Sequence, residues 1–137
     1  MTQGTTNFGT ATTNIAVVVS APVTTSNGAT FVSQTVPASL AKGANSFITL
    51  KFTNTGTSTW TAATNFRLGS RNPADNTTWG FTRVQLGSTI VPGATATFFF
   101  QCKAPATAGT YNMQWQMLQE GVDWFGDPST NAAIVVN

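Results

Sequence analysis

Residues 108–118 read AGTYNMQWQML, and this stretch decides the fold. Apolar and polar side chains alternate along it with a period of two, which is the pattern of a β-strand with one buried face. The two faces consist of Tyr111, Met113, Trp115 and Met117 on one side and of Asn112, Gln114 and Gln116 on the other. We therefore expect a half-buried antiparallel strand here, with Trp115 in the core.

Short apolar runs between turn signals continue on both sides of this strand. Further strands are expected at residues 31–36, 47–52, 66–68, 81–86, 98–102 and 132–136, and no window shows helical periodicity beyond chance. About seven short strands in roughly 110 residues are typical of an immunoglobulin-like antiparallel β-sandwich. The chain has 137 residues, which is enough for one such domain and too few for two ordinary ones. The sequence therefore predicts an all-β fold.

Tyr111 supports this fold class. It is the only tyrosine, and it follows Pro105 and the triplet Ala-Gly-Thr at the start of the alternating strand. Sandwiches of this class carry a tyrosine corner at such a position, in which the phenol hydroxyl bonds to main chain a few residues upstream. We expect the Tyr111 hydroxyl to bond to main chain within residues 104–107.

The residues also carry a family resemblance. The segments concerned are NTGTSTWTA (54–62), FRLGSRNPADNTTWGFTRVQL (66–86), VPGATATFFFQCKAPATAGTYNMQWQML (91–118) and QEGVDWFGD (119–127), which contain Trp60, Trp79, Trp115 and Trp124. Together they resemble the four-tryptophan domain, an immunoglobulin-like module found centrally in a class of autophagy cargo receptors and widely in bacterial proteins. The resemblance covers residues 29–136 and implies a non-enzymatic β-sandwich. It does not imply the autophagy role, because the ubiquitin-binding and other modules of those receptors are absent here.

The sequence of the closing strand occurs twice in the chain. Residues 8–19 read FGTATTNIAVVV and residues 125–136 read FGDPSTNAAIVV, so seven of twelve positions agree without a gap. We therefore divide the chain into an N-terminal arm (1–26), which resembles the closing strand of a preceding repeat, and an immunoglobulin-like domain (27–137).

The arm has three possible places: another edge of its own domain, a neighbour's sandwich, or solvent. We favour a neighbouring subunit, because an added strand supplies a row of main-chain hydrogen bonds and fills pockets with alternate side chains. The arm residues expected to make that contact are Ile15, Val17 and Val19.

Two phenylalanines are expected on the outer face of the sandwich. Alternation directs Phe47 away from Ile48, and it directs Phe99 away from Phe98 and Phe100. An outward aromatic side chain on a sheet usually indicates that another segment covers it. The N-terminal arm or a neighbouring subunit is the candidate cover, so Phe47 and Phe99 are also candidate assembly residues.

Composition argues against catalysis, metal binding and nucleic-acid binding. Only 7% of the residues are charged, against a usual ~25%. The six Lys and Arg are scattered along the sequence, whereas binding to a phosphate backbone requires clusters. Histidine is absent and Cys102 is the single cysteine, which excludes a Ser-His-Asp triad, a Cys-rich metal site and an intrachain disulfide. We expect no enzyme activity and no cofactor, and we favour Cys102 as a core residue over a reactive or intermolecular thiol.

An acidic segment surrounds the last tryptophan. Glu120, Asp123 and Asp127 flank Trp124, and an indole beside carboxylates can stack a sugar ring while the acids accept its hydroxyl hydrogen bonds. The alternative is a hairpin that turns at Glu120-Gly121, packs Trp124 and Phe125 inward and leaves the acids in water; we favour the hairpin. Trp79 joins the candidate ligand residues, although Trp60 and Trp79 fit packed lids over the sandwich ends better than ligand platforms.

These observations favour a structural role over a binding role. We expect a non-catalytic module of a surface assembly (a virion decoration or tail component, or an extracellular repeat protein) that self-associates or contacts neighbouring subunits. The alternative is a module that binds carbohydrate or protein through end loops around Trp79 and Trp124. No run approaches the ~20 apolar residues of a membrane span, and the N-terminus lacks a Sec-type signal peptide. We expect an extracellular or virion-surface location, and three explanations fit the missing signal: a sequence excised from a longer protein, export by another route, or release of a virion protein by lysis.

Overall fold

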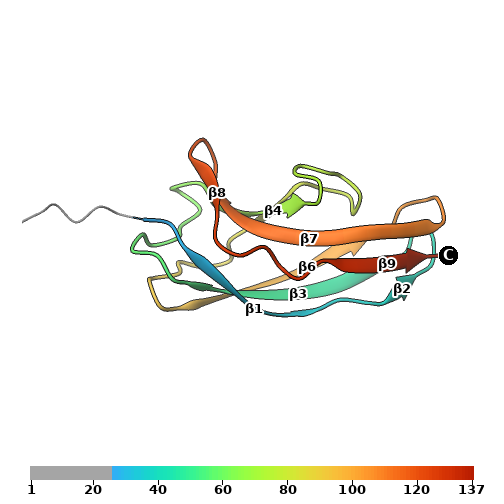
Figure 1. Ribbon diagram of the computed structural model, residues 1–137, viewed down its shortest axis with the longest axis horizontal. Helices are drawn as coiled ribbons and strands as arrows, with labels where there is room; N and C mark the ends of the chain where they lie inside the picture. Colours follow the sequence, from blue (N-terminus) through green and yellow to red (C-terminus); the bar gives the residue numbers. More distant parts are fainter. Residues whose placement is uncertain (1–25) are drawn as a thin grey trace, which may run out of the picture.

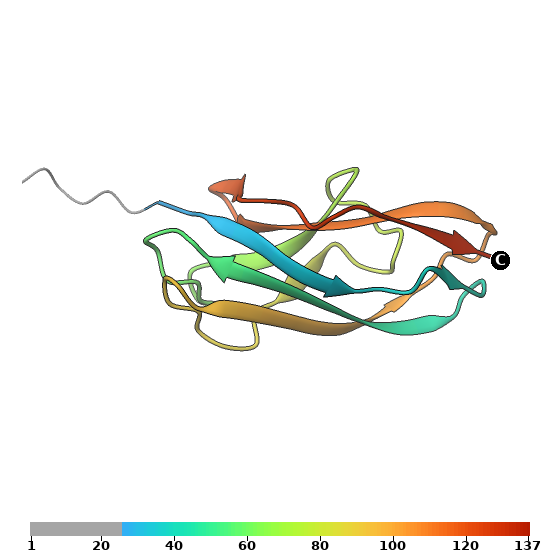
Figure 2. The same ribbon diagram turned by 60° about the horizontal axis from the view of Figure 1, so that its bottom comes forward.

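The computed structural model describes residues 26–137, which form nine β-strands in two facing sheets (Figure 1). The smaller sheet has the order β1-β3-β6, with β1 at Ala29–Thr35, β3 at Asn45–Asn54 and β6 at Thr95–Lys103. Figure 2 brings this sheet into view. The predicted immunoglobulin-like β-sandwich is confirmed.

The larger sheet has the order β2-β9-β7-β4-β5, and β8 pairs with the end of β7. Its strands are β2 (Ser39–Leu40), β4 (Phe66–Arg71), β5 (Arg83–Gln85), β7 (Gly109–Gln119), β8 (Asp123–Phe125) and β9 (Ala132–Val136). All pairs are antiparallel except β2 with β9, which is parallel. Among the described strands, β2 has no counterpart in the sequence prediction, because two residues are too few to show a period, and β8 corresponds only to the second half of the expected hairpin.

The core lies between the sheets and follows the alternation read from the sequence. Trp115 on β7 is 1% exposed, and its ring centroid lies 5.3 Å from that of Phe100 and 5.8 Å from that of Phe81. Trp60 and Trp79 are also buried. Within residues 26–137 no helix exists that could cross a membrane.

The tyrosine corner forms as expected. The Tyr111 hydroxyl donates to the Thr107 carbonyl oxygen at 2.8 Å, and the Tyr111 ring packs edge-on against Trp79 at a centroid distance of 6.4 Å. This bond ties the loop before β7 to the start of the strand. It therefore fixes the position at which β7 enters the sheet.

The described chain starts and stops at opposite ends of the sandwich. Ser26 lies beside Gln119 and Val122 of the β7–β8 hairpin, whereas the C-terminal Asn137 lies at the other end of the sandwich (Figure 1). The closing strand β9 is already flanked by β7 and β2. A second strand with the same sequence pattern, such as the one expected from residues 8–19, therefore cannot take this position in the same domain.

Cys102 is expected to resist thiol reagents in the native protein. Its side chain is 1% exposed on the inner face of β6, and burial raises the pKa of the thiol from its ordinary value of 9.0 to about 11. The folded protein holds the thiol proton more tightly than the unfolded chain does. The contribution of this difference to the free energy of unfolding is therefore fully present below pH 9 and is lost as the pH rises to about 11. Labelling should require denaturant at neutral pH; fast labelling of the native protein would contradict this placement.

Candidate functional site

Phe47 and Phe99 form a solvent-exposed aromatic pair on the outer face of the smaller sheet. Their side chains are 59% and 66% exposed, and their rings stack with centroids 5.0 Å apart and planes 2° from parallel. The pairing register of β3 and β6 places Phe99 opposite Thr49, so the two rings meet diagonally across neighbouring strands. The outward orientation predicted from the alternation is confirmed.

Two lysines flank this pair. Lys51 follows Phe47 by four residues on β3, and Lys103 follows Phe99 by four residues on β6. Because the two strands are antiparallel, the lysines lie on opposite sides of the aromatic rings, and both are exposed. We call the surface formed by Phe47, Lys51, Phe99 and Lys103 the aromatic face.

The aromatic face borders an open strand edge. β6 pairs with β3 on one side, and β6 is the last strand of its sheet. On the other side the described residues give it one main-chain hydrogen bond, from Lys103 N to Trp79 O at 3.1 Å. An edge of this kind is able to accept a further strand.

The β7–β8 hairpin holds Trp124 on the outer face of the larger sheet. Phe125 points inward and is 7% exposed, whereas Trp124 points outward and is half-buried. The expectation that both rings pack inward is therefore wrong for Trp124, because neighbouring residues of a strand face opposite sides. The expected hairpin itself is present.

Two arginines and a glycine seat the Trp124 ring. The guanidinium carbons of Arg71 and Arg83 lie over it at 4.7 Å and 5.1 Å from its centroid, which is the geometry of cation–π contacts. Gly69 lies beneath, and a Cβ atom there would come within 2.6 Å of the ring. The indole is therefore a packed part of the surface and offers no free platform to a sugar.

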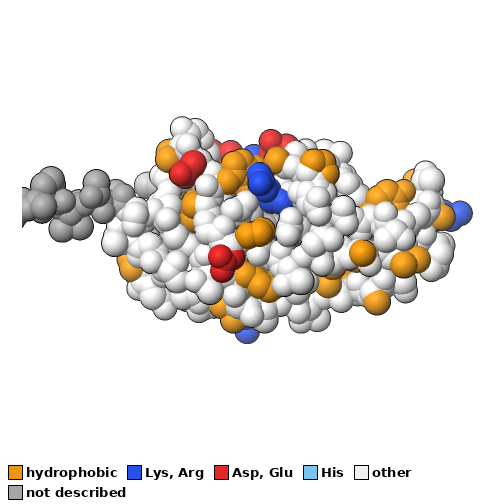
Figure 3. All heavy atoms as spheres, viewed as in Figure 1, with side chains coloured by type: hydrophobic (Ala, Val, Ile, Leu, Met, Phe, Trp, Pro, Cys, Tyr) orange, Lys and Arg blue, Asp and Glu red, His pale blue; other side chains and the backbone are white. Residues whose placement is uncertain are grey.

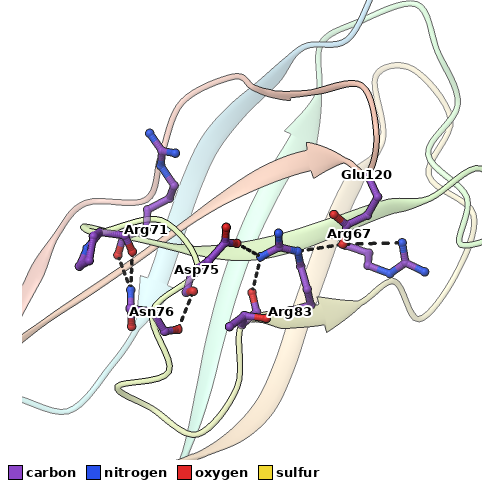
Figure 4. A network of polar contacts seen from close by, with 9 residues as sticks. Arg67, Arg71, Asp75, Asn76, Arg83 and Glu120 are labelled. Carbon is purple, nitrogen blue, oxygen red and sulfur yellow. Dashed lines mark hydrogen bonds and ion pairs between the residues drawn. The ribbon is translucent and has the colours of Figure 1, made fainter.

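Arg83 is the centre of a charged network (Figure 4). Its guanidinium lies 2.7 Å from a carboxylate oxygen of Asp75 and 2.9 Å from one of Glu120, and Arg67 approaches Glu120 at 4.0 Å. Burial alone would lower the pKa of Arg83, but the hydrogen bonds and charges of Glu120 and Asp75 outweigh it and raise that pKa. Glu120 is therefore paired with Arg83 at the surface, where its side chain is 36% exposed.

The structure separates the five candidate ligand residues. Trp79 is 2% exposed and donates its indole N–H to the Asn112 carbonyl oxygen, so its ring is inaccessible and we remove it from the set. Asp127 lies against β1, where its carboxylate accepts from Phe31 N at 3.4 Å. The remaining three, Glu120, Asp123 and Trp124, lie together around the hairpin and line one shallow pocket.

A larger cleft lies on the other side of this hairpin. Its volume is about 590 Å³, and hydroxyl and amide side chains dominate its lining, with Asp123 as its one charged residue. Val122 at the hairpin tip belongs to the rim and is 64% exposed. No group of three or more acidic, Cys or His side chains is placed to hold a metal ion within residues 26–137.

Sequence reasoning missed the arginine cluster. Arg67, Arg71 and Arg83 are scattered in the sequence, yet they meet on one sheet face because β5 folds back onto β4. The four-residue spacing of Arg67 and Arg71 on one strand was the available signal. The arm residues proposed for assembly, Ile15, Val17 and Val19, lie outside the described residues.

A family model for the Ig-like domain from next to BRCA1 gene matches residues 35–136, which include β2 to β9. The chain belongs to this Ig-like family. A search of curated proteins found no match. Both the aromatic face and the hairpin of this Ig-like domain lie within the matched residues.

Replacing Gly69 by alanine is expected to expel Trp124 from its seat. The new methyl group would overlap the indole and a methyl group of Leu118, at a cost of about 1 to 3 kcal/mol. The other three tryptophans are buried, so acrylamide quenching of the fluorescence reports mainly on Trp124 and should increase. Gly87→Ala is the matched control, because a Cβ atom there meets nothing within 4 Å. Equal quenching in both variants would show that the position of the Trp124 ring does not depend on Gly69.

Proposed function

We propose that this Ig-like domain is a non-catalytic assembly module of the four-tryptophan type. It associates with neighbouring copies through the aromatic face and the N-terminal arm. The observation that carries the proposal is the stacked pair of Phe47 and Phe99, which leaves two large aromatic side chains in solvent beside an open strand edge. The setting that suits such a module is a virion surface or an extracellular array.

Burial of this pair supplies a driving force for association. Covering a large apolar side chain completely is worth about 1.5 to 3 kcal/mol, and each ring still exposes more than half of its surface. Pairing of a further strand with β6 would add main-chain hydrogen bonds. The two contributions lie side by side on one surface, which favours a single contact region.

The arm carries the pattern of a strand that this fold accepts. In the closing segment the structure buries Phe125, Ile134 and Val136, and Gly126 has a φ of 75°. The arm has Phe8, Gly9, Val17 and Val19 at the corresponding positions. Its resemblance to the closing segment therefore includes the positions that matter most for packing.

The saccharide-binding alternative has lost its main support. Trp79 is buried, and Arg71 and Arg83 already occupy the ring of Trp124. A sugar would have to displace two cation–π contacts before it could stack. The protein-binding part of that alternative is compatible with assembly and is included in the proposal.

Size measurements on full-length variants test the proposal. The pair Phe47→Ser and Phe99→Ser, and separately Val17→Asp and Val19→Asp, are expected to abolish the self-association of the wild-type protein in analytical ultracentrifugation. Val91→Ser is the control, because Val91 is 53% exposed and lies in the turn before β6. A monomeric wild-type protein at all concentrations, or association unchanged by both double variants, would refute an assembly role.

A further inference from the structure

The charges of the described residues divide unequally between the two sheets. The three strands of the smaller sheet contain Lys51 and Lys103 and no acidic residue. All four acids of the chain lie elsewhere: Asp75, Glu120, Asp123 and Asp127. The aromatic face is therefore a basic surface without an internal counter-charge.

Two of the four acids are available to a partner. Asp75 and Glu120 are paired with Arg83, whereas Asp123 and Asp127 have no ion pair within residues 26–137 and are exposed. Both belong to the end of the molecule that carries β8, where acidic side chains are visible in Figure 3. We call Val122, Asp123 and Asp127 the acidic end; its Val122 is one of the exposed large apolar side chains.

We propose that the aromatic face of one copy docks on the acidic end of the next copy. This inference rests on the proposed self-association and states which two surfaces meet. A contact between two aromatic faces would bring four lysines together without an acid, and like charges at close range oppose association. Docking on the acidic end instead places two lysines against two aspartates and covers both Phe47 and Val122.

The N-terminal arm cannot replace the acidic end in this contact. Residues 1–25 contain no Asp, Glu, Lys or Arg, so they add apolar contacts and main-chain hydrogen bonds but no side-chain counter-charge. Pairing of the arm with the β6 edge and docking of the acidic end on the sheet face use different parts of the smaller sheet. The two contacts are therefore compatible.

When the aromatic face of one copy contacts the acidic end of another, the resulting dimer still has one free aromatic face and one free acidic end. Such a heterologous contact adds further copies until a ring closes, or it extends without limit if no ring closes. A contact between two identical faces stops at the dimer. The number of copies in the assembly therefore distinguishes the two arrangements.

Mixing two defective full-length variants tests the arrangement. One variant carries Phe47→Ser and Phe99→Ser and loses the aromatic face; the other carries Asp123→Lys and Asp127→Lys and loses the acidic end. Each alone is expected to associate at least tenfold more weakly than the wild type. Their equimolar mixture is expected to form heterodimers and nothing larger, because one intact surface of each kind remains. Mass photometry measures this directly.

A charge swap guards against a folding defect. Lys51→Asp and Lys103→Asp in one copy should restore association with the Asp123→Lys and Asp127→Lys copy, which misfolded protein could not do. Higher salt should weaken the wild-type contact, whereas it would strengthen a contact between two lysine-bearing faces. If the wild type associates but the aspartate variant associates equally well, the docking inference is wrong and assembly stands. If the wild type does not associate, both are wrong.

Discussion

Replacing Trp115 by alanine is expected to lower the free energy of unfolding by about 3 to 5 kcal/mol, the range for truncation of large core side chains. Trp115 is 1% exposed and packs against Phe81 and Phe100 between the sheets. Its indole nitrogen has no hydrogen-bond partner among the described residues, so truncation orphans no polar group there. The loss is therefore one of packing and of the cavity left behind.

Urea unfolding followed by circular dichroism measures this loss. Phe99→Ala is the matched control, because it removes another large aromatic side chain, but from the solvent-facing side of a strand. We expect that control to cost about 1 kcal/mol or less, because it loses only the cross-strand stacking on Phe47. Similar losses in both variants would mean that the inward and outward faces of these strands are assigned the wrong way round.

Period-two alternation explains why the fold could be predicted. β3, β6 and β7 each bury one face, so the inward and outward residues could be assigned from spacing alone, including the outward Phe47 and Phe99. The same rule requires the neighbouring residues Trp124 and Phe125 to point to opposite faces of the sheet. That error arose because an apolar pair at a hairpin suggests burial, while the cover for Trp124 comes from Arg71 and Arg83 on other strands.

The charged cluster depends on pairings that spacing does not reveal. Arg83 meets Glu120 across 37 residues of sequence, through the pairing of β5 with β4 and of β4 with β7. A chain with 7% charged residues suggests an evenly neutral surface. The structure instead gathers all three arginines on one face of the larger sheet, with Arg71 and Arg83 over Trp124, and places Lys51 and Lys103 on the smaller sheet.

Asn54 shows the same limit at a turn. From sequence, Asn54-Thr-Gly56 indicates a turn after β3. In the structure Asn54 is fully buried: its amide nitrogen donates to the carbonyl oxygens of Ser58 and Ile90, at 2.8 Å and 3.0 Å. Its side-chain oxygen accepts from Gly56 N at 3.1 Å. One side chain thus joins the end of β3 to two loops.

Replacing Asn54 by alanine is therefore expected to cost about 3 kcal/mol, or roughly 1 kcal/mol for each of the three hydrogen bonds lost. Asn54→Asp should cost more at neutral pH, because a buried carboxylate would face two carbonyl oxygens, and acidification should relieve part of that cost. Urea unfolding at pH 7 and pH 4 measures both effects. Asn45→Ala, at the exposed start of the same strand, is the control and should be nearly neutral. Equal stability of the Asn54→Ala and Asn45→Ala variants would show that the loops do not depend on this side chain.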